Sequence, residues 1–339
     1  MSDFGELLKR LVSGASLNSS EAADAFGAIM RGEVSEARMA ALLTALSVRK
    51  PAVAEIVGAV RAMRGAMQRV KAPEDAIDVC GTGGDGMGTL NVSTATAFVV
   101  AACGVPVAKH GNRSMSSQTG AADVLDALDV PTDLGPEAAA KSLRETGFCF
   151  LFAPKYHAAM EHVAPVRREL GFRTIFNLIG PLSNPAGVKR QLIGVFSTEW
   201  LEPVAEALRE LGTEAAWVVH SDDGLDEISI AAPTQVAVLQ HGAISRRTIM
   251  PEDAGVPRAP ISAIAGGDAR ANAAAIRALL ACEPSPFRDI VVLNAAAALV
   301  VAQRAVGLRE GAAMAAHAID SERAKNVLAR ASSISEMAQ

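Results

Sequence analysis

A glycine-rich segment at residues 81–88 is the first part of this 339-residue chain whose residue types suit chemistry. It reads GTGGDGMG, follows the β-branched run AIDVC and precedes NVST. Glycines let a backbone turn its N–H groups toward an anion. Asn91, Ser93 and Thr94 are suited to capping a helix whose N-terminus would point at the same place. The spacing predicts a phosphate-binding loop.

Two other nucleotide-binding motifs share part of this pattern. Residues 81–86 fit GxGxxG, but a dinucleotide fold needs its helix to open at the third glycine and an acidic residue roughly 20 positions on. The next predicted strand, VPVA at 105–108, leads into Lys109 instead. A Walker loop needs a closing GK[ST], and this segment has none. The pattern therefore favours neither motif.

A second loop, KHGNRSMSS at 109–117, follows that predicted strand. Lys109 suits phosphate as a point charge, whereas Arg113 suits either an anionic ligand or a carboxylate that anchors the loop. Ser114, Ser116 and Ser117 supply short hydroxyl donors. Ligands of open α/β sheets bind beyond the carboxyl ends of the strands, so two such loops at successive strand ends strengthen the prediction of an anion site.

A third loop, SDDGLDEIS, follows the predicted strand AAWVVH and carries Asp222, Asp223, Asp226 and Glu227. Acidic loops are commonly solvated turns. Mg²⁺, however, prefers one or two protein carboxylates together with substrate phosphates and water. Beside two phosphate loops, the adjacent pair of Asp226 and Glu227 is the better candidate for holding it.

Other catalytic arrangements are not indicated. His157, Glu161 and His162 give HxxxEH, which matches neither HExxH nor HxxEH, so these histidines are expected to pack or to face solvent. The chain has no GxSxG nucleophile elbow. The four cysteines lie far apart, without metal or redox spacing, and are interpreted as small buried residues in a reducing compartment.

The elements that position these loops fall into two regions. The first 70 residues predict helices, with Asn18 and Glu21 as a capping pair, Ser35 before a second helix and Pro51 in the first turn of a third. The apolar stripes are Met39, Leu42, Leu43 and Leu46, followed by Val53, Ile56, Val57, Val60 and Met67. Helix-on-helix packing is the expected result.

From residue 76 onward, β-branched runs alternate with Ala-rich segments, the pattern of a largely parallel sheet. The predicted strands are AIDVC, VPVA, FCFLFA, QLIGVF, AAWVVH and DIVVLN. The fold class is therefore α/β, with a small helical N-terminal domain at 1–72, a linker at 71–75 and a large α/β domain at 76–339 whose central sheet is mostly parallel.

Composition limits the remaining classes. Half of the residues are hydrophobic and 20% are charged, which excludes general disorder. The net charge of −5 disfavours a nucleic-acid partner. The N-terminus lacks a secretory signal, so a cytoplasmic protein is expected. The uncharged stretch 86–108 is interpreted as a loop, a buried helix and a strand, and no membrane partner is expected.

Taken in order, GTGGD with NVST, KHGNRS, VRRELGFRTIFNLIGPLSNPA and GLDEIS closely resemble the anthranilate phosphoribosyltransferases, over nearly the whole chain. The resemblance implies Mg²⁺-dependent transfer of a phosphoribosyl group from phosphoribosyl pyrophosphate to the amine of anthranilate in tryptophan biosynthesis. Positioning and metal would suffice, without a general base. It also implies a homodimer, a helical domain joined by a segment near 170–185, and substrates at the hinge.

The resemblance assigns site residues position by position. For phosphoribosyl pyrophosphate they are Gly81, Gly84, Asp85, Thr89, Asn91, Val92, Ser93, Thr94, Lys109, His110, Gly111, Asn112, Arg113, Ser114, Met115, Ser116, Ser117 and Ala121. For anthranilate they are Gly81, Asn112 and Arg167. For Mg²⁺ they are Ser93, Asp226 and Glu227.

The chain departs from the family pattern at two positions. Ala121 stands where a Ser or Thr is usual, which removes one hydroxyl near the substrate, and Gln118 stands where Lys is common. Two rival functions remain. A pyrimidine nucleoside phosphorylase is disfavoured by KHGNRS and the Asp-Glu pair, and a nucleic-acid-binding paralogue is disfavoured by the acidic charge.

Overall fold

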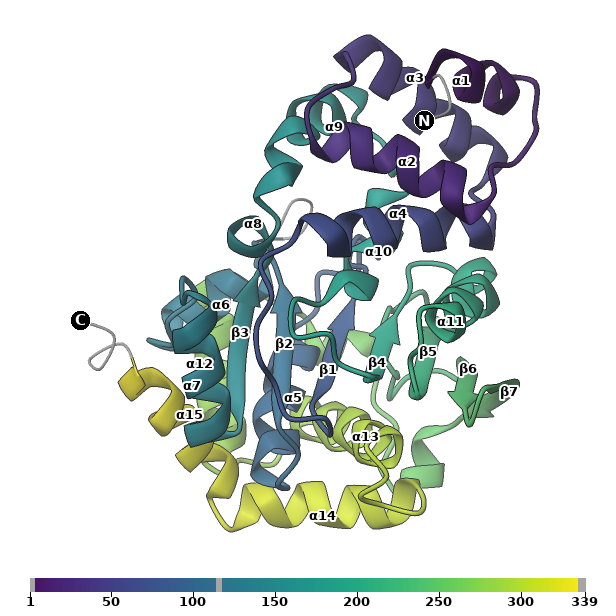
Figure 1. Ribbon diagram of the computed structural model, residues 1–339. Coiled ribbons are helices and arrows are strands. Elements are labelled where there is room, and N and C mark those ends of the chain that lie inside the picture. Colours follow the sequence, from purple (N-terminus) through teal and green to yellow (C-terminus); the bar gives the residue numbers. More distant parts are fainter. Residues whose placement is uncertain (1–3, 114–117, 335–339) are drawn as a thin grey trace.

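The computed structural model describes residues 4–113 and 118–334. Figure 1 shows a bundle of helices standing over a larger domain built on a sheet. The bundle begins with α1 (Phe4–Val12), α2 (Ser19–Met30), α3 (Glu36–Arg49) and α4 (Val53–Ala66). Among the described residues, no helix combines the length and the apolar character needed to cross a membrane.

Local signals explain where these helices begin. The side chain of Asn18 accepts hydrogen bonds from the N–H groups of Ser20 and Glu21 at 3.0 and 2.9 Å, and Glu21 accepts the Asn18 N–H at 2.9 Å, which confirms the capping pair. The stripe Met39–Leu46 on α3 is buried, as its spacing predicts. The prediction for Pro51 is wrong, since α4 begins at Val53 and Pro51 precedes it.

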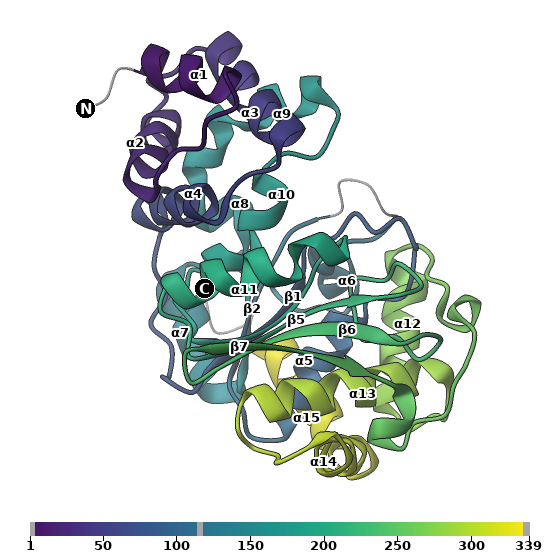
Figure 2. The same cartoon turned by 90° about the vertical axis from the view of Figure 1, so that its right-hand side faces the viewer.

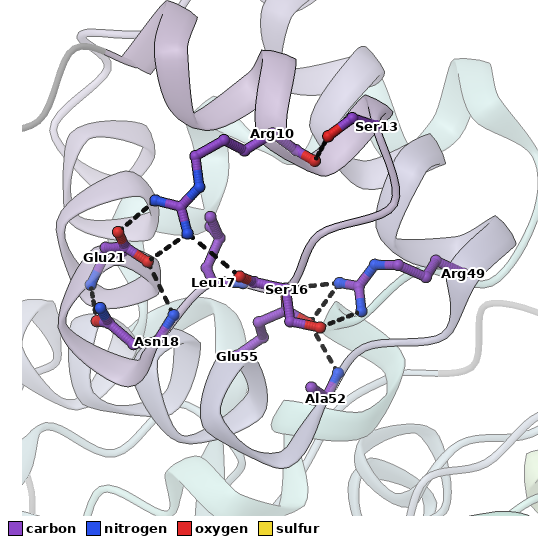
Figure 3. A network of polar contacts seen from close by, with 9 residues as sticks. All are labelled: Arg10, Ser13, Ser16, Leu17, Asn18, Glu21, Arg49, Ala52 and Glu55. Carbon is purple, nitrogen blue, oxygen red and sulfur yellow. Dashed lines mark hydrogen bonds and ion pairs between the residues drawn. The ribbon is translucent and has the colours of Figure 1, made fainter.

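A buried carboxylate ties the bundle together (Figure 3). Glu55, only 1% exposed, accepts hydrogen bonds from Leu17 N–H at 2.9 Å and Ala52 N–H at 2.7 Å. Arg49 at the end of α3 pairs with the same carboxylate at 2.6 Å. One side chain therefore joins the start of α4, the end of α3 and the segment that enters α2.

Within residues 4–113 and 118–334, the sheet has seven strands in the order β3-β2-β1-β4-β5-β6-β7. Five are parallel, and the last two pair antiparallel. The strands are β1 (Ile77–Gly81), β2 (Val107–Gly111), β3 (Phe148–Phe152), β4 (Arg190–Gly194), β5 (Ala215–Ser221), β6 (Thr234–Gln240) and β7 (Ala243–Ile249). The predicted fold class, a helical N-terminal domain with a mostly parallel sheet domain, is confirmed.

One predicted strand is wrong, and one pair of strands was not predicted. The run DIVVLN lies inside helix α13 (Pro286–Val301), where Ser285 caps the N-terminus and Pro286 occupies the first turn. The β6–β7 hairpin was not predicted from the sequence. Its turn consists of His241 and Gly242, both with positive φ, the geometry of a two-residue hairpin turn.

Helices cover both faces of the sheet (Figure 2). On one face α5 (Val92–Ala102) and α13 form the main core with α12 (Ala269–Leu280), α14 (Leu308–Asp320) and α15 (Arg323–Ser333). On the other, α11 (Leu201–Glu210) packs between the sheet and α4. The expected loop, buried helix and strand over 86–108 are confirmed by α5 and β2. Short elements complete this domain: α6 (Ala121–Ala127), α7 (Pro136–Thr146), η3 (Thr198–Trp200), η4 (Pro251–Ala254) and η5 (Ile261–Ile264).

Between β3 and β4 the chain returns to the bundle. This segment contains α8 (Ala153–Tyr156), η1 (Ala158–His162), α9 (Ala164–Leu170), α10 (Phe176–Ile179) and η2 (Pro181–Ser183). Helix α9 packs on α3, and α10 packs on α4. The segment therefore lies where the bundle faces the carboxyl ends of the parallel strands (Figure 1).

Replacement of Glu55 tests the role of its buried carboxylate. Glu55→Ala should lower the free energy of unfolding by about 2–4 kcal/mol, because two backbone N–H groups and Arg49 lose their acceptor. Urea denaturation measures this loss. Glu6→Ala, which breaks an exposed pair with Lys9, is the control and should cost under about 0.5 kcal/mol. Equal losses in the two variants would contradict the assignment.

Candidate active site

The site lies where the order of the strands reverses. From β1 the chain adds β2 and β3 on one side and β4 and β5 on the other, and ligands of such sheets bind beyond the strand ends at this point. A cavity of about 890 Å³ opens there, between the loops after β1, β2 and β5 and the returning segment 153–181.

The cavity brings together all the predicted site residues that the structure describes. The loop after β1 and the start of α5 contribute Gly81, Gly84, Asp85, Thr89, Asn91, Val92, Ser93 and Thr94. The second loop and its neighbours contribute Lys109, His110, Gly111, Asn112, Arg113 and Ala121. Arg167, Asp226 and Glu227 complete the lining. Ser114, Met115, Ser116 and Ser117 lie outside the described residues.

Carboxylates of the acidic loop meet both anion-binding elements. Gly83 N–H, in a loop with repeated positive φ, donates to Asp226 Oδ2 at 2.8 Å. Ser93 N–H, in the first turn of α5, donates to Glu227 Oε1 at 3.1 Å. The expected capping by Asn91 is not found, since Asn91 sits at the N-cap position but its side chain makes no cap hydrogen bond.

Two glycines make room for the acidic loop. A Cβ added at Gly194, the last residue of β4, would lie 1.5 Å from the backbone oxygen of Asp226. A Cβ at Gly81 would lie 2.5 Å from Asp226 Oδ2. Because the contact at Gly194 is with backbone, only glycine there lets the loop after β5 reach across β4, whereas a side chain at Gly81 would displace the Asp226 carboxylate.

The acidic loop and the loops after β1 and β2 form one wall of the cavity, and the charges on this wall favour a cation. Burial raises the pKa of both Asp226 and Glu227 above the usual carboxylate range, and Asp85 adds like charge next to Asp226. Within the described residues, no three His, Cys, Asp or Glu side chains converge as a complete protein cage for a metal. Two carboxylates in an incomplete shell fit Mg²⁺, which takes its remaining ligands from phosphate and water.

The two basic residues of the second loop have different partners. Lys109 is 2% exposed, and its ammonium donates to Val79 O at 2.7 Å and to Ser93 Oγ at 3.1 Å. Arg113 pairs with Asp123 at 2.8 Å and Asp126 at 2.7 Å. Of the two roles that the sequence left open for Arg113, the structure has it anchoring the loop on α6.

The opposite wall of the cavity carries the guanidinium of Arg167. Arg167, half-buried on α9, stacks over the ring of Phe176 at 5.7 Å, and burial lowers the pKa of its guanidinium. No carboxylate in the described part of the chain lies within ion-pair distance of it. Arg168 lines the same cavity but is exposed. The geometry of this wall suits a small carboxylate.

The two histidines of the HxxxEH segment behave as expected, since His157 is packed and His162 is exposed. His157 is 3% exposed and lines the cavity, with its ring centroid 5.1 Å from that of His110. The HxxxEH spacing does not indicate that His157 lines a cavity. Its place in the sequence does indicate this, because His157 lies shortly after the carboxyl end of β3, and ligands of such sheets bind beyond the strand ends.

Comparisons with known proteins agree with this site. The chain matches the model of the glycosyl transferase family helical bundle domain at residues 5–67 and that of the a/b domain at 73–325. An anthranilate phosphoribosyltransferase from Rhodopseudomonas palustris (strain HaA2) is 55% identical over 338 residues, covering 100% of each chain.

The chain belongs to the anthranilate phosphoribosyltransferase family. The crystal structure of a member from Thermus thermophilus is 44% identical, with a TM-score of 0.92 over 96% of this chain and 98% of that one. A Saccharomyces cerevisiae member in complex with PRPP and Mg is 27% identical, with a TM-score of 0.90 over 98% of this chain and 97% of that one. The family resemblance seen in the sequence is thereby confirmed.

The buried histidines predict acid sensitivity. Burial lowers the pKa of His110 to about 3 and that of His157 to about 4, so between pH 4 and 6.5 each of these two side chains binds fewer protons in the folded chain than in the unfolded chain. Each histidine therefore makes stability rise with pH across this window, by up to about 1.4 kcal/mol per pH unit, and adds no slope above it.

Denaturation at several pH values measures this slope. His157→Asn should be less sensitive to acid than the wild type, and the difference between the two isolates one histidine from the titrating carboxylates. His162→Asn, at an exposed position, is the control. Identical pH profiles for the wild type and His157→Asn would rule out a buried neutral His157.

Proposed function

We propose that this chain transfers the 5-phosphoribosyl group from phosphoribosyl pyrophosphate to the amine of anthranilate, giving N-(5-phosphoribosyl)anthranilate and pyrophosphate in tryptophan biosynthesis. The observation that carries the proposal is one cavity with two chemically different walls. Phosphate-type loops and an acidic pair form the first wall, and the unpaired Arg167 lies on the second. The family of the chain supports the same reaction.

Phosphoribosyl pyrophosphate would lie along the loops after β1 and β2. Glycines 81 and 84, Thr89 and the start of α5 would meet its pyrophosphate end through backbone N–H groups and short side chains. The buried ammonium of Lys109 has three donors, two of which hold Val79 O and Ser93 Oγ, so one is left for a phosphate oxygen. Residues 109–117 and Ala121 would enclose the ribose phosphate.

Asp226, Glu227 and Ser93 would hold Mg²⁺ beside the pyrophosphate. In the structure, the carboxyl groups already accept the N–H groups of Gly83 and Ser93, so a bare phosphate arriving there would meet two groups whose ionised form repels it. An anion accompanied by a divalent cation fits this wall better. When bound, Mg²⁺ stabilises the negative charge that develops on the leaving group.

Anthranilate would lie against the second wall, with its carboxylate on Arg167 and its amine toward Asn112 and Gly81. The planar guanidinium matches a carboxylate in two parallel hydrogen bonds. Phe176 holds the guanidinium from behind. This placement leaves the amine on the side of the cavity where the ribose would lie.

The reaction breaks the bond between the anomeric carbon and pyrophosphate oxygen and forms one from that carbon to the amine nitrogen. The electron pair of the broken bond leaves with pyrophosphate, and the nitrogen then gives up a proton to solvent or to the phosphate. An aniline nitrogen is neutral at pH 7, so no strong base is required. Orientation of the two substrates lowers the barrier, by several kcal/mol in well-aligned cases.

Three further features belong to this proposal. The helical domain would comprise residues 1–72 with the segment near 170–185, and the α/β domain would comprise 76–339. The chain would act as a cytoplasmic homodimer. Its partners would be the two small substrates, without nucleic acid or membrane.

Loss of anthranilate fluorescence tests the function directly. The purified chain with Mg²⁺ and phosphoribosyl pyrophosphate should consume anthranilate, and Arg167→Ala should raise the KM for anthranilate about 30-fold or more, since a buried charge pair is worth 2–5 kcal/mol. The KM for phosphoribosyl pyrophosphate should change little. Arg168→Ala is the matched control. Anthranilate left untouched, with thymidine or uridine cleaved by phosphate instead, would refute the proposal.

Removal of the acidic pair tests the metal assignment. The double variant Asp226→Asn, Glu227→Gln should lower kcat by about 100-fold, on the scale of losing a preorganised electrostatic group. Its stability in metal-free buffer should be equal to or above that of the wild type, because like charges are removed from a buried wall. Asp222→Asn, on the same loop but outside the cavity lining, is the control. An unchanged rate and Mg²⁺ dependence would leave SDDGLDEIS as a solvated turn.

A further inference from the structure

A closed ring of four hydrogen bonds lies behind the phosphate wall. Asn272 Nδ2 donates to Asn91 Oδ1 at 2.8 Å, and Asn91 Nδ2 donates to Thr119 O at 3.3 Å. Thr119 Oγ1 donates to Gly267 O at 2.8 Å, and Gly267 N–H donates to Asn272 Oδ1 at 2.8 Å. Three segments distant in sequence therefore meet in one polar circuit.

A short ladder holds the same segment against the first loop. Leu90 N–H donates to Ile264 O at 2.9 Å, and Gly266 N–H donates to Gly88 O at 2.8 Å. A Cβ at Gly266 would lie 2.5 Å from Thr89 O, so glycine is required for this approach. The stretch 264–267 is thus fixed to the chain that joins the glycine loop to α5.

The ring residues differ in their exposure to the cavity. Asn91 and Thr119 line it, whereas Asn272, on α12 and only 1% exposed, does not. Helix α12 lies beside α6, which follows the second loop (Figure 2). Asn272 thus holds two lining residues from behind and has no direct access to a ligand.

We propose that Asn272 is a positioning residue for the phosphoribosyl side of the site. It fixes the amide of Asn91 directly and, through Gly267, the side chain of Thr119. The inference rests on the proposed function and on Asn91 as a phosphoribosyl pyrophosphate contact. It adds a residue from the last third of the chain to the machinery of the reaction.

The chemistry of the ring explains why an amide is needed. Asn272 donates with its nitrogen and accepts with its oxygen, so its orientation sets that of Asn91. Without this donor, Asn91 Oδ1 loses its 2.8 Å partner and the amide keeps the longer 3.3 Å bond to Thr119 O, which restrains it less. Loss of one bond also loosens the others, because linked hydrogen bonds support one another.

Steady-state kinetics on the full chain test the proposal. Asn272→Ala should raise the KM for phosphoribosyl pyrophosphate at least tenfold, while the KM for anthranilate stays within twofold. Asn18→Ala, which removes a helix cap in the bundle far from the cavity lining, is the control for lost stability. At a comparable drop in Tm, it should leave both KM values unchanged.

A second pair of variants makes the test independent of whether the Asn272→Ala variant folds. Thr119→Ser retains the hydroxyl and should keep the wild-type KM for phosphoribosyl pyrophosphate, whereas Thr119→Val should raise it. Combined with Asn272→Ala, Thr119→Val should add little, since the ring is already open. Equal Thr119→Ser and Thr119→Val values, or equal rises in both KM values for Asn272→Ala, would overturn the positioning role.

A further measurement distinguishes a failure of the proposed function from a failure of the role of Asn272. Binding of phosphoribosyl pyrophosphate with Mg²⁺ to the wild type, measured by calorimetry, gives a readout that does not need turnover. A wild type that neither binds it nor consumes anthranilate would sink the function. A wild type that does both, beside an Asn272→Ala variant with unchanged affinity, would sink only the role of Asn272.

Discussion

Two hydrogen bonds from backbone N–H groups to buried carboxylates set the geometry of this site. Gly83 donates to Asp226, and Ser93 donates to Glu227, which joins the loops after β1 and β5 across the intervening strand β4. The crossing is possible because β4 ends in a glycine that leaves room for the backbone of Asp226. The carboxylates occupy two N–H groups that would otherwise be open to an anion, which supports the proposal that this wall takes an anion together with a cation.

The segment that returns to the helical bundle supplies the cationic side of the cavity, which the strand-end loops do not form. The parallel strands deliver donors and carboxylates, whereas Arg167 and the ring of Phe176 come from the segment that returns to the bundle between β3 and β4. That segment is held by contacts from the bundle itself: the guanidinium of Arg64 on α4 donates to Leu182 O at 2.9 and 2.6 Å. One continuous core therefore joins the bundle, the returning segment and α11 to one face of the sheet, while the core around α5 and α13 supports the phosphate loops from the other face.

Local signals predicted most of the fold, and they failed where a pattern fits two structures. The run DIVVLN contains four consecutive apolar residues, which fit either a buried strand or a buried helix, and the deciding signal is the Ser285–Pro286 helix start just before it. Strand β6 has the short apolar run VAVL and β7 is mostly polar and exposed, so neither alternates, and the local signal for this hairpin is its His-Gly turn. In the site, strand-end loops were predictable because parallel strands end on one edge. The partners of Arg113 were left open because Asp123 and Asp126 lie on a helix whose direction the sequence does not state.

Contacts between distant residues explain the part that sequence reasoning missed. Asn91 looks like a helix cap, yet its amide is used by Asn272, 181 positions away. The choice of a neutral side chain there follows from the charge of the cavity. Asp85, Asp226 and Glu227 already make this wall negative, with Lys109 as the buried positive group beside them. A charged residue in place of Asn272 would change the net charge of this wall. Under the proposed function, it would also change the affinity for metal and pyrophosphate. Amide and hydroxyl groups fix the two loops while leaving the charge of the wall to the groups that meet the ligand.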